Sequence, residues 1–121
     1  MRALIVDDSK SMRMILGKAL QELGFEIAHA SHGQEALERL KAGEEVDLVL
    51  ADWNMPVLNG YELVCAIRAN PLLANVRILM VTTELSTRQV QLALAAGANE
   101  YLMKPFTREV LLEKLALLGM N

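Results

Sequence analysis

Short runs of apolar residues alternate along the chain with segments in which apolar residues recur every three or four positions. A run of four to eight apolar residues bounded by turn residues predicts a buried strand, whereas the three-to-four spacing predicts a helix. Strands are expected at residues 3–6, 25–31, 46–52, 76–81 and 101–103. Helices are expected at residues 12–23, 33–42, 61–70, 86–96 and 107–118.

Five strand–helix pairs in strict alternation predict an α/β fold with helices on both faces of a parallel sheet. A closed eight-fold barrel needs about 200 residues or more, so this chain of 121 residues is expected to form an open sheet and a single domain, residues 1–121. The first, third and fourth strands are the most apolar, which favours a central place for them. We therefore expect a doubly wound, flavodoxin-like sheet in the order 2-1-3-4-5.

Charge and hydropathy argue against two classes of partner. The net charge of −3 offers no basic surface for nucleic acid. No apolar segment reaches the eighteen or so residues of a membrane span, and the first apolar run is too short for a signal peptide, so a cytoplasmic protein is expected. The single cysteine, Cys65, lies in an apolar helical pattern and is expected to be buried. Five methionines lie in apolar segments and are expected to fill the core: Met12, Met14, Met55, Met80 and Met103.

Polar residues that could bind a ligand or take part in catalysis lie at the ends of four of the predicted strands. Asp7 and Asp8 follow the first strand, Asp52 ends the third, Thr82 follows the fourth and Lys104 follows the fifth. Because the carboxyl ends of parallel strands meet at one edge of the sheet, these side chains are expected to converge. Three neighbouring carboxylates repel one another unless a hard cation binds their oxygens, and Mg²⁺ has that preference.

The same set of groups suits phosphoryl transfer, in which positioning and charge neutralisation supply most of the catalysis. Asp52 would be the nucleophile, Lys104 would pair with phosphoryl oxygens, and Thr82 would donate a hydrogen bond to one of them. A buried ion-pair network that only stabilises the edge is the alternative interpretation. A nucleotide or flavin site is disfavoured, because no glycine-rich phosphate loop follows any strand. His29 and His32 are expected in a solvated loop rather than as ligands.

Five motifs, each placed after its own predicted strand or opening the next helix, carry a resemblance to a known family. They are VDDS at residues 6–9, ADWNMP at 51–56, NG at 59–60, VTT at 81–83 and GANEYLMKPF at 97–106. Together they resemble the receiver domain of bacterial two-component response regulators, and most of all the stand-alone regulators of chemotaxis. The family has the 2-1-3-4-5 strand order, so that expectation rests on the resemblance as well as on hydropathy.

The resemblance implies specific roles at the strand ends. It makes Asp52 the phosphoacceptor, and Thr82 and Lys104 the groups that contact the phosphoryl group. It implies a cis peptide bond between Lys104 and Pro105. The implied Mg²⁺ ligands are Asp7, Asp8, Asp52 and the main-chain carbonyl of Asn54.

The resemblance also implies a conformational switch and a set of residues that tune the phosphoryl lifetime. Phosphorylation would draw the Thr82 hydroxyl inward, and the ring of Tyr101 would follow into the vacated space. Asn54 and Glu84 occupy the tuning positions. Thr83 stands where the family often has a smaller residue, so its side chain could restrict access of a phosphodonor or of water.

The implied function is a phosphorylation-activated signalling module rather than an enzyme. The donor would be a histidine kinase or a phosphotransfer protein, and an output protein would bind the surface of the fourth helix, fifth strand and fifth helix. No output domain is expected, and the protein would be a monomer or a phosphorylation-dependent dimer. Aspartyl-phosphate phosphatases and transferases are the enzyme alternative, but they place an acid–base aspartate where this chain has Asn54.

Overall fold

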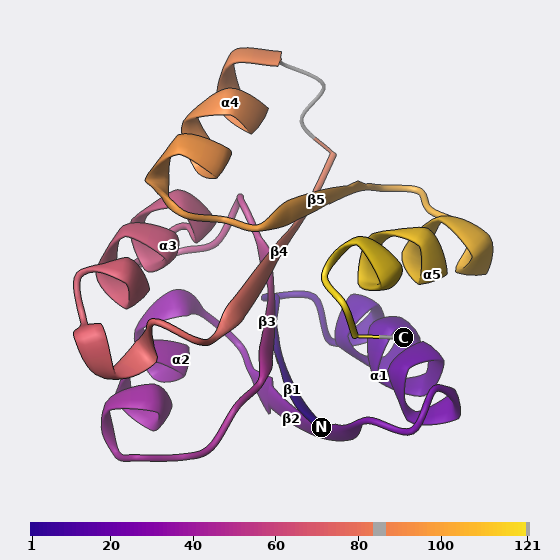
Figure 1. The fold of residues 1–121 in the computed structure, drawn as a ribbon, viewed down its shortest axis with the longest axis horizontal. Helices are drawn as coiled ribbons and strands as arrows, with labels where there is room; N and C mark the ends of the chain where they lie inside the picture. Colours follow the sequence, from indigo (N-terminus) through magenta and orange to yellow (C-terminus); the bar gives the residue numbers. More distant parts are fainter. Residues whose placement is uncertain (84–86, 121) are drawn as a thin grey trace.

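A five-stranded parallel sheet runs through the middle of the computed structural model, which describes residues 1–83 and 87–120 (Figure 1). The strands are β1 (Arg2–Val6), β2 (Glu26–Ala30), β3 (Leu48–Asp52), β4 (Arg77–Thr82) and β5 (Glu100–Met103). The helices are α1 (Lys10–Glu22), α2 (Gly33–Lys41), α3 (Gly60–Arg68), the short 3₁₀ helix η1 (Pro71–Leu73), α4 (Thr87–Ala96) and α5 (Arg108–Leu117).

The strand order is β2-β1-β3-β4-β5, with every neighbouring pair parallel, which confirms the predicted order. β3 is buried along its whole length, whereas the edge strands β2 and β5 have mixed exposure. The register pairs Val6 with Ala51, and Thr82 with Met103. The carboxyl ends of the four strands that precede the candidate site residues therefore lie side by side.

The helices form two layers, with α1 and α5 on one face of the sheet and α2, α3 and α4 on the other (Figure 1). Successive residues of a strand point to opposite faces, and β1 shows the consequence. Leu4 and Val6 belong to the apolar cluster under α2 and α3, while Ala3 and Ile5 belong to the cluster under α1 and α5. The sheet is thus buried on both sides, as a parallel sheet requires.

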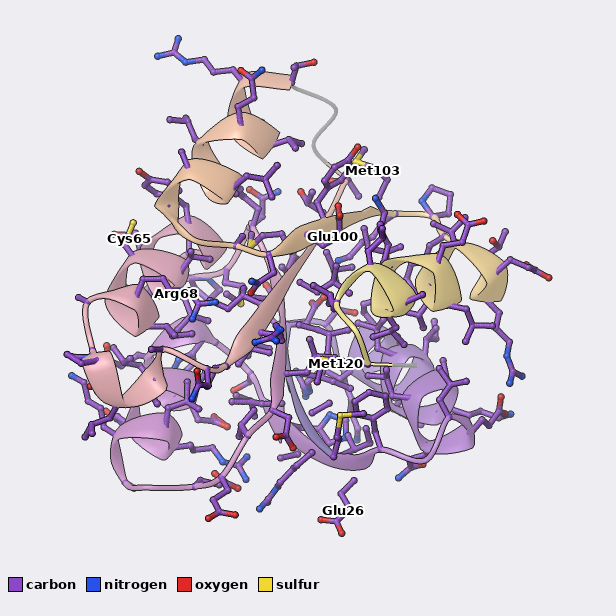
Figure 2. All side chains as sticks on the ribbon, in the orientation of Figure 1. Glu26, Cys65, Arg68, Glu100, Met103 and Met120 are labelled. Atoms are coloured by element: carbon purple, nitrogen blue, oxygen red, sulfur yellow. The ribbon has the colours of Figure 1, made fainter. Side chains whose placement is uncertain are left out.

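Two predictions of burial were wrong. Met14 on α1 is 63% exposed, and its neighbour Ile15 is 55% exposed, because the buried stripe of this helix runs through Leu16, Gly17 and Leu20. Cys65 is exposed on the outer side of α3 (Figure 2), since the buried positions of that helix lie at other phases of its turn. Those positions are Gly60, Leu63, Val64 and Ile67.

The predicted elements match the observed ones to within a few residues at each end. Glu84 and the predicted helix start at Ser86 lie outside the described residues. Within residues 1–83 and 87–120, no helix is both long enough and apolar enough to cross a membrane.

Candidate functional site

The first acidic group of the site is fixed where β1 turns into α1. Asp7 is 1% exposed, and its main-chain N–H donates to the carbonyl of Ala30 at 3.2 Å. Its Oδ1 accepts the N–H of Ser9 at 2.9 Å, and Ser9 then caps α1 by accepting the N–H of Met12. Arg13 donates to the Asp7 carbonyl. Helix capping and the position of the carboxylate therefore depend on the same short turn.

Asp52 ends β3 and is 9% exposed. The turn that follows brings the chain back against it, because the N–H of Gly60 donates to the carbonyl of Trp53 at 2.9 Å. A Cβ atom on Gly60 would lie 2.2 Å from the carbonyl oxygen of Asp52. Only glycine fits so close to the backbone at this point. Asn59 and Glu62 then form a capping box at the start of α3.

The ammonium of Lys104 lies between the two buried carboxylates. Its Nζ is 3.1 Å from Asp7 Oδ2 and 3.4 Å from Asp52 Oδ2, and the side chain is 13% exposed. The main-chain N–H of Lys104 donates to the carbonyl of Thr82 at 2.9 Å. The peptide bond between Lys104 and Pro105 is cis, as the resemblance implied. The end of β5 thus delivers one positive charge to the acidic edge.

The surroundings of Asp52 make its ionised form costly. Burial is the main cause that raises the pKa of Asp52, and the charge of Asp7 raises it further. The charge of Lys104 and the N–H of Asn54, which donates to Asp52 Oδ1 at 3.4 Å, act in the opposite direction but do not outweigh burial. One lysine is too little positive charge for this group of carboxylates, so a further cation would be bound favourably.

Asp7, Asp8 and Asp52 can offer one oxygen each to a single metal ion, because these three atoms lie within 4.8 Å of one another. Asp7 and Asp52 are buried, whereas Asp8 is exposed and faces solvent. A set made only of carboxylate oxygens suits a hard divalent cation that also keeps water ligands. The donors therefore fit the predicted kind of metal. His32 is not a member, because its Nδ1 caps α2 by accepting the N–H of Glu35.

Thr82, Thr83, Asn54 and Tyr101, the other predicted site residues that the structure describes, differ in burial. Thr82 is 3% exposed at the end of β4, while the neighbouring Thr83 and also Asn54 are exposed. Tyr101 lies on β5 and is partly buried against the apolar cluster under α2, α3 and α4. The structure thus brings together Asp7, Asp8, Asp52 and Lys104, with Thr82 on the next strand end.

Sequence reasoning missed two contacts of aromatic rings, one next to Asp52 in the chain and one on β5. The ring of Trp53 stacks on that of Tyr61, with centroids 5.6 Å apart. The ammonium of Lys114 lies 4.2 Å from the centre of the Tyr101 ring. Trp53 and Tyr61 are eight residues apart, and the sequence does not show how the turn between them folds. The contact of Lys114 with Tyr101 depends on how α5 packs along β5. No sequence signal could have revealed either contact.

The family model described as "Response regulator receiver domain" matches residues 3–116. The chain belongs to the response-regulator receiver family. The four strand ends described above are thus the acidic edge of a receiver domain, in a sheet of the order predicted for it.

Curated relatives of this receiver domain match over nearly its whole length. The chemotaxis protein CheY1 of Helicobacter pylori is 46% identical over 123 residues, which cover 100% of this chain and 99% of the relative. The chemotaxis protein CheY of Pseudomonas aeruginosa is 44% identical over 116 residues, which cover 95% of this chain and 93% of the relative.

Solved structures show the same architecture. CheY4 of Vibrio cholerae has a TM-score of 0.87 and 38% identity, and the match covers 99% of this chain and 98% of that one. A CheX–CheY–BeF₃–Mg²⁺ complex from Borrelia burgdorferi gives a TM-score of 0.90 and 26% identity, covering 100% of this chain and 90% of that one.

Proposed function

We propose that this receiver domain is a phosphorylation-activated signalling module whose phosphoacceptor is Asp52. The observation that carries the proposal is the meeting of Asp7, Asp8 and Asp52 within 4.8 Å, with Lys104 bridging two of them at 3.1 and 3.4 Å. The three carboxylates outnumber the one ammonium that lies between two of them, and a site that binds a divalent cation needs this excess of negative charge.

In the proposed reaction, an Asp52 carboxylate oxygen attacks the phosphorus of a phosphohistidine on a histidine kinase or a phosphotransfer protein. The new O–P bond forms as the P–N bond breaks, and the imidazole leaves with the electron pair and takes a proton from solvent. Lys104 moves from its carboxylate partners to a phosphoryl oxygen, and Thr82 donates a hydrogen bond to another. The product is an acyl phosphate on Asp52.

Mg²⁺ is the proposed cofactor, held by Asp7, Asp8, Asp52 and the main-chain carbonyl of Asn54. When bound, it supplies positive charge that offsets the repulsion among the carboxylates and the incoming phosphoryl oxygens. Two of the proposed Mg²⁺ ligands are already held in place, because the carboxylates of Asp7 and Asp52 accept hydrogen bonds from main-chain N–H groups.

The signal would pass from Thr82 to Tyr101 and so to a partner at the surface of α4, β5 and α5. Addition of about two negative charges at Asp52 biases an existing equilibrium between two arrangements of that surface. The chemotaxis names of the relatives favour a chemotaxis output protein as the partner. Asn54, Thr83 and Glu84 are proposed to tune the lifetime of the phosphoryl group. A cytoplasmic location, and a monomer or a phosphorylation-dependent dimer, belong to the same proposal.

Fluorescence of Trp53 tests this function, because the residue follows Asp52 directly and its ring stacks on Tyr61. We expect beryllofluoride, a phosphoryl analogue, to change the emission only when Mg²⁺ is present. Asp52→Asn should abolish the change. Lys104→Ala should keep the fold and Mg²⁺ binding but weaken the response to beryllofluoride. A response that persists in Asp52→Asn would contradict the assignment.

A further inference from the structure

Three side chains meet at the outer edge of the sheet, beside β5. The Nζ of Lys114 is 3.1 Å from Glu100 Oε1 and 4.2 Å from the centre of the Tyr101 ring. The same Glu100 oxygen accepts the main-chain N–H of Tyr101 at 3.1 Å. The side chains of Lys114 and Glu100 are 19% and 20% exposed, so the contact is largely sheltered from solvent. One carboxylate therefore holds the ammonium that lies over the ring.

The path of these side chains shows where the ring lies. Among the described residues β5 is an edge strand paired with β4, and its alternate residues point to opposite faces of the sheet. Leu102 packs in the layer of α1 and α5, so Glu100 is on that side, where it pairs with Lys114, and Tyr101 is on the side of α4. Lys114 belongs to α5 and can lie over the ring only around the open edge of the strand. The ring is therefore held at that edge.

We infer that Glu100 and Lys114 are positioning residues that set the balance of the Tyr101 switch. The cation attracts the electron-rich face of the ring, and the carboxylate fixes the cation where this attraction acts. Movement of the ring inward, beneath α4, would separate it from Lys114. The contact therefore favours the arrangement with the ring at the edge. This inference rests on the switch role given to Tyr101 in the proposed function.

A link between the contact and the phosphoryl site follows from thermodynamic reciprocity. If occupation of Asp52 favours the inward ring, then a change that shifts the ring toward the inward position must strengthen binding at Asp52, by at most the factor that couples the ring to the site. Loss of the Lys114 cation should therefore change binding at Asp52, although Lys114 itself contacts the start of β5. A residue with a purely structural role would lower stability without improving this binding.

The test compares Lys114→Met with wild type, because methionine keeps an unbranched apolar side chain and removes only the charge. The ring is followed by ¹⁹F NMR of fluorotyrosine in a Tyr61→Phe background, in which Tyr101 is the one tyrosine left. Binding at Asp52 is followed as the Mg²⁺-dependent beryllofluoride titration of Trp53 fluorescence. We expect the Tyr101 resonance to shift and beryllofluoride to bind about threefold to tenfold more tightly.

Three further variants make the test decisive. Lys114→Arg retains a cation over the ring and should behave as wild type. Glu100→Gln removes the carboxylate that holds Lys114 and should tighten beryllofluoride binding by a smaller factor. This variant replaces Lys114→Met as the test if Lys114→Met does not fold. Lys18→Met on the exposed face of α1 makes the same change in net charge and should have no effect.

Unchanged or weaker beryllofluoride binding in both Lys114→Met and Glu100→Gln would overturn the inference, as would equal tightening in Lys18→Met. Failure of the proposed function looks different. In that case wild type itself gives no Mg²⁺-dependent response, or the response persists in Asp52→Asn.

Discussion

The two edges of the sheet both carry charged side chains, but they pair them differently. At the amino edge, Glu44 accepts from Arg39 at 2.7 Å and from Arg2 at 2.7 Å, so this anion has two cations. At the carboxyl edge, Lys104 is shared between Asp7 and Asp52, and Asp8 lies near both. One carboxylate is thus paired with two guanidinium groups at the amino edge, whereas one ammonium is shared between two carboxylates at the carboxyl edge.

The difference separates stability from function. Paired charges at the amino edge hold loops to strand starts, and they need no ligand. The carboxyl edge keeps Asp52 buried beside a like charge, which costs stability until a cation or a modifying group arrives. The fold thus keeps a group of neighbouring carboxylates at the carboxyl edge, whereas Glu44 is paired with cations at the amino edge, and the following variants should expose this contrast.

Arg68 should give the largest change in stability, because it joins three segments at the amino edge (Figure 2). Its guanidinium donates to the carbonyls of Gly97, Leu73 and Val76 at 2.9, 3.2 and 2.7 Å. Arg68→Ala would leave these carbonyls without their charged donor, and we expect a loss of about 3 kcal/mol in urea unfolding.

The matched control for that measurement is Arg77→Ala, since Arg77 is exposed at the start of β4 and donates to the carbonyl of Asn75 at 3.3 Å. We expect it to change the free energy of unfolding by about 0.5 kcal/mol or less. Similar losses in the two variants would show that Arg68 has no special role as a junction.

Gly60→Ala should be the most damaging small change at the carboxyl edge. The added Cβ would lie 2.2 Å from the Asp52 carbonyl oxygen and 2.8 Å from Met80 Cε, so the turn after β3 must shift. We expect a loss of about 2 kcal/mol, together with weaker Mg²⁺ binding in a Trp53 titration. Gly43→Ala provides a comparison, because its positive φ of 89° strains alanine but no atom lies near the added Cβ. It should leave Mg²⁺ binding unchanged.

Asp52→Asn should stabilise the protein in the presence of EDTA. Because the pKa of Asp52 is raised, the folded state binds more protons than the unfolded state between the ordinary value of 3.8 and the raised one. Its ionisation therefore removes stability as pH rises through that window. We expect the variant to be about 1 kcal/mol more stable than wild type at pH 7 and equal to it below pH 3.8. Lower stability at pH 7 would mean that the pair with Lys104 outweighs burial.

Glu44→Gln should show the opposite dependence on pH, with a smaller amplitude. The hydrogen bond from Arg39 is the main cause that lowers the pKa of Glu44 below its ordinary value of 4.5, with the charges of Arg39 and Arg2 acting in the same direction. Its contribution is present above that value and is lost as pH falls through the lowered pKa. We expect a loss of about 0.5 kcal/mol at pH 7. Urea unfolding of wild type and variant should converge at low pH.

The sequence allowed the fold and the centre of the candidate site to be predicted for one physical reason. Strand ends of a parallel sheet meet at one edge, so the place of Asp7, Asp52 and Lys104 follows from strand boundaries alone. The burial of Met14 and Cys65 was predicted wrongly, because an apolar residue in a helix can lie just outside the buried stripe.

The contacts that depend on loop paths and side-chain reach could not be predicted at all. Arg68 donates to Gly97 across 29 positions of sequence, and Lys114 lies over Tyr101 from a different layer of the fold. Such contacts are set by how whole elements pack, and no local pattern of hydropathy or charge records them. Both lie away from the strand ends, where sequence reasoning was strongest.

The most direct measurement is the position and metal dependence of phosphorylation by a small-molecule phosphodonor, mapped by peptide mass spectrometry. Borohydride reduction converts an aspartyl phosphate into a stable homoserine and so preserves the position of the label. We expect one modified residue, Asp52, with modification that requires Mg²⁺ and is lost in Asp52→Asn. Modification at another residue, or equal modification of Asp52 in EDTA, would contradict this expectation.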